Sequence, residues 1–128
     1  MDAGQLKRIP LFSDASDEEL KQVAAFAQSK EIPEGEVIVS EGGFSRELLA
    51  IEEGTAEVTR DGERIADLGP GDVFGEAGML DDSMRSATVT STSRMRLISL
   101  GHFEVQRLKK DAPGVYRSIE QLVEERSD

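Results

Sequence analysis

The sequence predicts a mainly β domain with helices at both ends. Three observations support this fold class: apolar residues recur at helical spacing near each end, short β-prone runs separated by turn residues fill the middle, and 128 residues suit one domain. A domain of this length buries roughly two-thirds of the surface of its unfolded chain, so a core can form without disulfides, and the chain has no Cys. We therefore predict one domain over 1–128, with a helical part at 1–28, a β-rich part at 29–100 and C-terminal helices at 101–126.

A capping box predicts the first helix. Ser16 and Glu19 have the S-x-x-E spacing in which the hydroxyl and the carboxylate satisfy each other's free backbone N–H groups. Apolar side chains then follow on one stripe, at Leu20, Val23, Ala24 and Ala27. This pattern predicts an amphipathic helix at about 17–28.

Short β-prone runs follow, separated by turn residues. Strands are predicted at 36–40, 47–52, 55–60, 63–68, 86–91 and 94–100. Asp61-Gly62 is a strong hairpin signal, because both positions of such a turn need residues that tolerate a positive φ. Pro33-Glu34-Gly35 and Gly69-Pro70-Gly71-Asp72 predict further turns. This succession is typical of an antiparallel sandwich or barrel.

The helical period returns after Gly101. Apolar residues recur at Phe103, Val105 and Leu108, and again at Val115, Ile119, Leu122 and Val123. Asp111-Ala112-Pro113 lies between the two stretches and predicts a helix start, since Pro suits the first helical position. The chain is therefore expected to end on an amphipathic helix.

The charge balance limits the partners. The chain carries 15 Lys and Arg against 26 Asp and Glu, a formal net charge of -11, so we expect no direct nucleic-acid partner. No apolar run reaches the roughly 18 residues that cross a bilayer, and the first residues lack a basic region followed by an apolar stretch. The chain has no Cys and so gives no sign of the disulfides that an oxidising compartment favours. We therefore expect a cytoplasmic protein that does not enter a membrane.

The segment 71–89 carries the candidate chemistry. Gly75 and Gly78 bracket two residues, and such small residues let backbone N–H groups approach an anion closely. Arg85 follows nine residues after Glu76, and its planar guanidinium suits a bidentate contact with a phosphate. An ionised Glu76 only accepts hydrogen bonds, so it suits a sugar hydroxyl. These residue types together indicate a sugar-phosphate site.

Other interpretations of these residues stay open at this level. A Gly-rich segment between strands is commonly a turn, and Arg85 close behind Asp81 and Asp82 is commonly half of a solvated ion pair. A metal-dependent enzyme built on a β-roll usually draws on several imidazoles, whereas His102 is the only His. We therefore expect neither a catalytic site nor a metal site.

Two motifs resemble the phosphate-binding cassette of the cyclic nucleotide-binding domain family, the type found in catabolite activator protein and the protein kinase A regulatory subunit. Phe74-Gly75-Glu76 and Arg85-Ser86-Ala87-Thr88-Val89 match the family's pattern at its usual separation. The likeness extends to 33–38 and, most specifically, to 69–76. It implies an eight-stranded antiparallel β-roll, a jelly-roll-like double-stranded β-helix, with N-terminal and C-terminal α-helices.

The resemblance also implies roles for individual residues. Glu76 would accept from the ribose 2′-hydroxyl, Arg85 would pair with the cyclic phosphate, and the Ser86 hydroxyl with nearby backbone N–H groups would complete the phosphate contacts. The ligand-binding residues predicted in this way are Phe74, Gly75, Glu76, Ala77, Arg85, Ser86 and Ala87. The chain departs from the family at Met84, where Pro is usual, and at Gly78, where many members have Ala.

The implied function is that of a regulatory or sensor module that binds cAMP, in preference to cGMP, through 74–89 and needs no further cofactor. The C-terminal helix would move on binding, with a lid over the base formed by Val115, Tyr116, Ile119 and Leu122. The alternative is that this stripe simply packs on the barrel. The expected partner is an effector protein in trans or a second copy of the chain. The competing interpretation is a ligand-free β-roll that serves as a protein-interaction or dimerisation module.

Overall fold

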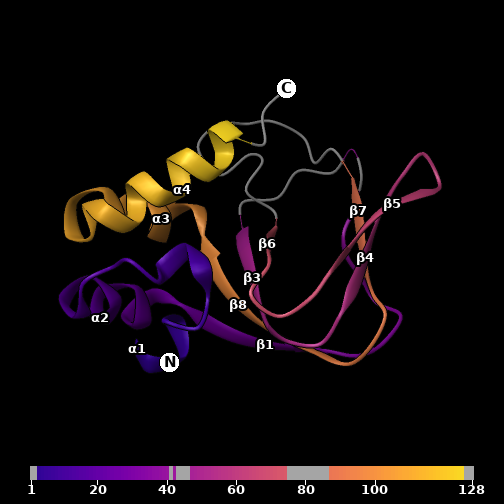
Figure 1. The fold of residues 1–128 in the computed structure, drawn as a ribbon, viewed down its shortest axis with the longest axis horizontal. Helices are drawn as coiled ribbons and strands as arrows, with labels where there is room; N and C mark the ends of the chain where they lie inside the picture. The colour runs from indigo at the N-terminus through magenta and orange to yellow at the C-terminus, as the bar shows by residue number, and fades with distance from the viewer. Residues whose placement is uncertain (1–2, 41, 43–46, 75–86, 126–128) are drawn as a thin grey trace.

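A helical layer lies against a roll of two β-sheets in the computed structural model, which describes residues 3–40, 42, 47–74 and 87–125. Helices α2, α3 and α4 gather on one side of β3 and β8, and β4, β5 and β7 lie on the other (Figure 1). In chain order the elements are α1 (Ala3–Leu6), η1 (Pro10–Phe12), α2 (Asp17–Phe26), β1 (Gln28–Ile32), β2 (Val37–Val39), β3 (Glu47–Glu53), β4 (Ala56–Arg60), β5 (Glu63–Leu68), β6 (Val73–Phe74), β7 (Thr88–Ser91), β8 (Met95–Gly101), α3 (His102–Asp111) and α4 (Pro113–Glu125).

Eight strands, counted over the described ranges, form two four-stranded sheets in which every pairing is antiparallel. The first sheet has the order β1-β8-β3-β6 and the second has the order β2-β7-β4-β5. The chain alternates between the two sheets except at the β4–β5 hairpin. The predicted eight-stranded β-roll with helices at both ends is therefore confirmed.

Two strands and one helix end differ from the sequence prediction. The residues of β1 are mostly polar and exposed, so no apolar alternation marks it; it forms because its backbone pairs with β8 from Gln28 to Ile32. Helix α2 consequently ends at Phe26 rather than at 28, since the chain must already extend into β1. Strand β6 has only two residues, too few to show a period.

Strand β3 is buried on both faces, and this divides the core in two. Leu48 and Ala50 lie in a cluster shared with the helices, whereas Leu49 and Ile51 lie in a cluster between the two sheets. Successive side chains of a strand point to opposite faces, so an unbroken apolar run marks a strand that is covered on both sides. The first sheet is thus the middle layer of the domain.

The predicted turns form, and their polar groups are satisfied. Asp61 and Gly62 have φ values of 54° and 82°, as a tight hairpin turn requires. The buried Ser91, at the end of β7, donates its hydroxyl to the Pro33 carbonyl at 2.6 Å and accepts from the Glu36 N–H at 2.9 Å. Its hydroxyl therefore fixes the turn that precedes β2 without leaving an unpaired buried group.

Replacing Gly54 should destabilise the fold strongly. Its φ is +96°, and an added Cβ would lie 2.4 Å from the Arg94 carbonyl oxygen and 2.8 Å from the Met95 Cα. We expect Gly54→Ala to lower the free energy of unfolding by roughly 2–4 kcal/mol, because backbone strain and overpacking against the main chain add. Urea denaturation measures the difference.

Gly62→Ala is the matched control, since Gly62 has a φ of +82° but no atom within 4 Å of the added Cβ. This variant should cost only about 1–2 kcal/mol, the strain of a left-handed backbone. Equal losses in the two variants would mean that the close approach at Gly54 contributes nothing.

Candidate functional site

The predicted ligand-binding segment connects β6 to β7. Phe74 and Ala87, its two ends, are described. Gly75, Glu76, Ala77, Arg85 and Ser86, together with Gly78 and Met84, lie outside the described residues, and their roles stay predictions. The structure describes the strands on either side of the segment, β6 before it and β7 after it.

Phe74 anchors the start of the segment. Strand β6 pairs with β3, with Leu49 opposite Phe74 and Ala50 opposite Val73. The Phe74 side chain is buried in the cluster between the two sheets. Burial there fixes the backbone at Phe74, the last described residue before Gly75, and a contact between Phe74 and ligand stays a prediction.

The turn before β6 is clamped to β3. The Gly69 N–H donates to Asp72 Oδ2 at 2.8 Å, and the Asp72 N–H donates to the Gly69 carbonyl at 3.0 Å. Two further bonds of 2.8 Å join this turn to Ile51, one from the Gly71 N–H and one to the Asp72 carbonyl. Gly71 has a φ of +93°, which glycine adopts at little cost. These bonds thereby fix the backbone at the start of β6.

The segment returns into the other sheet. Ala87 is half-buried and directly precedes β7, which pairs with both β2 and β4. Val89, two residues on, is buried in the same cluster as Phe74. The strands that precede and follow residues 75–86, β6 and β7, therefore belong to different sheets.

The predicted lid residues are packed in the helical layer. Val115, Tyr116 and Ile119 of α4 are between 0% and 9% exposed and belong to the cluster shared by the helices and the first sheet, and Leu122 is half-buried against it. This is the packing that the alternative interpretation of the stripe describes. A lid over a base would require α4 to move, and that role stays a prediction.

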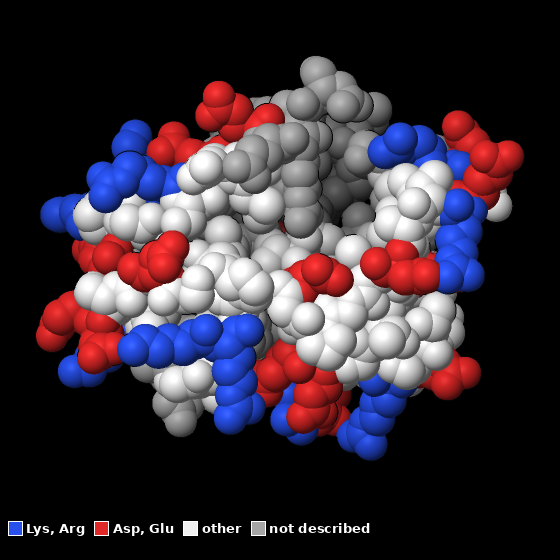
Figure 2. Space-filling view, viewed as in Figure 1, with Lys and Arg blue, Asp and Glu red and all other residues white. Residues whose placement is uncertain are grey.

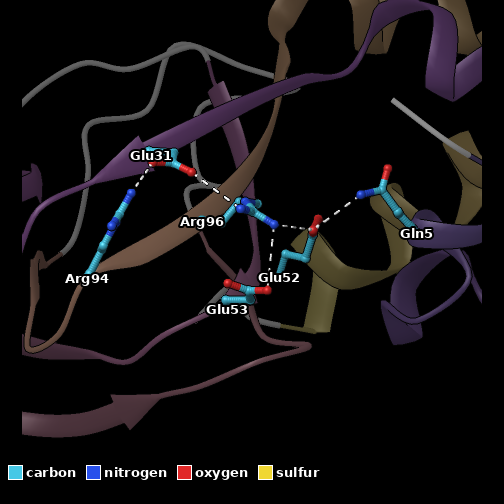
Figure 3. A network of polar contacts seen from close by, with 6 residues as sticks. All are labelled: Gln5, Glu31, Glu52, Glu53, Arg94 and Arg96. Carbon is cyan, nitrogen blue, oxygen red and sulfur yellow. Dashed lines mark hydrogen bonds and ion pairs between the residues drawn. The ribbon is translucent and has the colours of Figure 1, made fainter.

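A charged network joins β1, β8 and the end of β3 (Figure 3). Arg94 contacts Glu31 at 2.6 Å, and Arg96 contacts Glu31 at 3.4 Å, Glu52 at 3.7 Å and Glu53 at 3.6 Å. Gln5 of α1 donates to Glu52 at 3.4 Å. Because both guanidiniums already face carboxylates, the neighbouring hollow of about 410 Å³ is not suited to an anionic ligand.

The network shifts the titration of its members. Hydrogen bonds from Arg94 and then from Arg96 hold the pKa of the Glu31 carboxyl below its ordinary value. The pKa of Arg96 is raised in turn, by its hydrogen bond to Glu31 and by the charge of Glu53. The acidic and basic members of the network lie far apart in the sequence, so no local sequence pattern could have indicated it.

Charges of both signs are mixed over the face of the described residues seen in Figure 2. Figure 2 shows basic and acidic side chains interspersed over the face drawn, without a continuous basic stripe among the described residues. In the same part of the chain, no helix combines the length and apolar character needed to span a bilayer, and no group of three His, Cys, Asp or Glu side chains is arranged to hold a metal ion. His102 is the first residue of α3 and lies edge-on to Phe103, with ring centroids 5.6 Å apart.

The lowered pKa of Glu31 predicts a pH-dependent contribution to stability. A carboxyl with a depressed folded pKa stabilises the fold above its unfolded pKa of about 4.3, and this stabilisation is lost as the pH falls through the folded value. We therefore expect Glu31→Gln to be less stable than the wild type near neutral pH, with the gap closing below about pH 4. Urea denaturation between roughly pH 3 and pH 7 measures it. Glu34→Gln, at an exposed carboxylate in the turn that follows β1, is the control, and an equal pH dependence in both variants would contradict the assignment.

Comparisons with known proteins agree with this architecture. A family model described as the cyclic nucleotide-binding domain matches residues 29–111. A cAMP-dependent protein kinase regulatory subunit from Yarrowia lipolytica is 36% identical over 107 residues, which cover 82% of this chain and 28% of that protein. A putative potassium channel protein from Rhodopseudomonas palustris is 34% identical over 123 residues, which cover 94% of this chain and 30% of that protein. The chain thus spans less than a third of the length of either relative.

A solved structure shows the same fold. The catabolite activator protein of Thermus thermophilus superposes with a TM-score of 0.83 at 28% sequence identity, covering 91% of this chain and 57% of that one. The family model describes a cyclic nucleotide-binding domain, and the Yarrowia lipolytica relative is a regulatory subunit. Because the family model matches more than half of the 128 residues, this chain belongs to the cyclic nucleotide-binding domain family.

Proposed function

We propose that the chain is a regulatory module that binds cAMP through residues 74–89. The observation that carries the proposal is the frame of this segment: its two ends are rooted in opposite sheets, and between them the sequence places Glu76 and Arg85 at the family's separation. The cAMP-dependent kinase regulatory subunit among the relatives supports cAMP as the ligand.

Arg85 supplies the charge for the cyclic phosphate, and Glu76 accepts from the ribose 2′-hydroxyl. Backbone N–H groups near Gly75, Ala77 and Ala87 complete the anion site with the Ser86 hydroxyl. The net charge of -11 does not oppose this binding. A contact pair at about 4 Å contributes several times more than exposed carboxylates that lie beyond a Debye length of about 8 Å.

The proposal also specifies the base of the nucleotide. Ser86 could donate to the phosphate of cAMP, or reach the amino group of a guanine in the syn form, so the residue alone fits both nucleotides. We favour cAMP because of the named relative. No metal or other cofactor enters the proposal, and neither does catalysis, since binding alone accounts for the residues used.

The output is a change in the position of α4, sensed by an effector protein in the cytoplasm or by a second copy of the chain. A nucleotide can shift this position only if it binds one arrangement of α4 more tightly than another. In the relatives the matched region is under a third of the protein, which supports an effector that is attached to it or acts in trans.

A ligand-free protein-interaction module is the second candidate, and one observation favours it. Phe103 on α3 is 75% exposed and borders a hollow of about 590 Å³ together with Gln106, Arg107 and Lys110. Aromatic and Arg side chains are enriched in protein–protein interfaces, and Phe103 and Arg107 lie together at this hollow.

Calorimetric titration with cAMP and cGMP separates the two candidates. We expect the wild type to bind cAMP, and Arg85→Ala to weaken binding by about 2–5 kcal/mol, roughly thirtyfold to several thousandfold, because a phosphate loses its charge partner. Glu76→Ala should cost less, since it removes a contact to a neutral hydroxyl.

Arg64→Ala is the matched control for loss of a guanidinium, because Arg64 is exposed on β5 and pairs with Asp67. It should leave the affinity unchanged. Absence of heat with either nucleotide in the wild type, together with no thermal shift at high nucleotide concentration, would favour the ligand-free module.

A further inference from the structure

Helix α4 begins without a capping side chain of its own. Ala112 occupies the N-cap position, because its carbonyl accepts the first intrahelical bond, from the Tyr116 N–H at 3.0 Å. Alanine has no side-chain acceptor, and Pro113 has no N–H. The N–H groups of the first turn that have no acceptor within the helix therefore belong to Gly114 and Val115. These two groups need a partner from elsewhere.

Glu19 of α2 is that partner. Its Oε2 accepts from the Gly114 N–H at 2.7 Å and from the Val115 N–H at 3.2 Å. Both bonds are partly buried and charge-assisted, and the carboxylate lies at the positive end of the helix dipole. A residue 95 positions away thus does what an N-cap side chain usually does.

The absence of a side chain at Gly114 permits this approach. A Cβ at this position would lie 2.8 Å from each carboxylate oxygen of Glu19. Since those oxygens are the far end of a flexible side chain, an alanine would displace the carboxylate rather than the backbone.

Glu19 also belongs to the cap of its own helix. Its N–H donates to Ser16 Oγ at 3.1 Å, and the Ser16 hydroxyl lies 3.4 Å from Glu19 Oε1. One carboxylate oxygen therefore faces the start of α2 and the other faces the start of α4. The two helix starts are joined through a single side chain.

We propose that Glu19 is the positioning residue of α4. The two hydrogen bonds from Gly114 and Val115 to Glu19 Oε2, here called the Glu19 latch, fix the first turn of α4 to α2, and α4 changes orientation when the latch opens. Its use in signalling rests on the proposed function.

Much of the remaining contact described between α4 and the domain is apolar, with a cation–π contact from Lys109 of α3 to the Tyr116 ring at 5.9 Å beside it. Val115, Tyr116 and Ile119 pack in the shared cluster, and such contacts are non-directional, so they tolerate small rotations and shifts. Hydrogen bonds weaken steeply with angle and distance, so the latch is either formed or broken. This difference makes the carboxylate, rather than the apolar stripe, the feature that specifies one orientation.

Two variants open the latch from opposite sides. Glu19→Ala removes the acceptor, while Gly114→Ala retains the Glu19 carboxylate but pushes it away from the first turn of α4. Glu18→Ala is the control, because Glu18 carries the same charge in the same turn of α2 but is exposed. Measured by NMR, amide exchange at Val115 should accelerate about tenfold or more in both latch variants and stay unchanged in the control.

Gly114→Ala separates positioning from simple stabilisation. Alanine has a higher helix propensity than glycine, so a purely stabilising account predicts slower exchange in this variant, whereas an open latch predicts faster exchange. An effect confined to Glu19→Ala would instead reflect its lost contact with Ser16, and would overturn the proposal.

Spin labels measure the orientation directly. The chain has no Cys, so Ala25→Cys on α2 and Glu120→Cys on α4 place two labels at exposed positions. The distance distribution between them should broaden or shift when either latch variant is added and remain as in the wild type with Glu18→Ala. An unchanged distribution in the latch variants would overturn the proposal.

Titration with cAMP tests the link to signalling. If α4 responds to the nucleotide, its Kd should shift by about threefold or more, in the same direction, in both latch variants. An unchanged Kd would overturn the link. If the wild type binds no nucleotide, the proposed function fails, while amide exchange and label distances still decide whether Glu19 positions α4.

Discussion

The burial of one sheet on both faces is the constraint on which the rest of the structure depends. In β8, as in β3, some apolar side chains face the helices, among them Ile98 and Leu100, and others face the second sheet, among them Met95 and Leu97. Removing apolar surface from water is the dominant favourable term in folding, so such a sheet is stable only with cover on both sides. The apolar stripes of the helices and the inner face of the second sheet provide that cover.

Individual charged side chains have partners close by, although the chain as a whole carries a large negative net charge. The chain carries an excess of carboxylates, yet Arg94 and Arg96 are each matched with acidic partners on neighbouring strands, and Glu19 is matched with backbone N–H groups. Exposed pairs of this kind contribute little each, whereas a carboxylate at a helix start is directional and partly buried. An anion site in this domain therefore depends on the residues immediately around it and not on the field of the whole chain.

Much of the fold could be predicted from short-range patterns. The Asp61-Gly62 turn and the apolar run of β3 act over a few residues, and each was found where expected. Of the predicted capping box, the bond from the Glu19 N–H to the Ser16 hydroxyl forms, whereas the Glu19 carboxylate accepts from the start of α4. Strand β1 could not be predicted, because it is held by pairing with β8 and not by its own composition. The candidate site was predicted from a family likeness, and only its ends are described. The contact between Glu19 and α4 joins residues distant in sequence, and its one local sign is the lack of a capping side chain at Ala112.

The two residues of β6 face different sides of the middle sheet: Val73 packs among the helices, and Phe74 packs inside the roll. Strand β3 pairs with both residues of β6 and so fixes their position in the sheet. Any sliding or tilting of β6 would therefore change the side-chain packing in both hydrophobic clusters. The two hydrophobic clusters thus meet at adjacent residues of one strand, Val73 and Phe74.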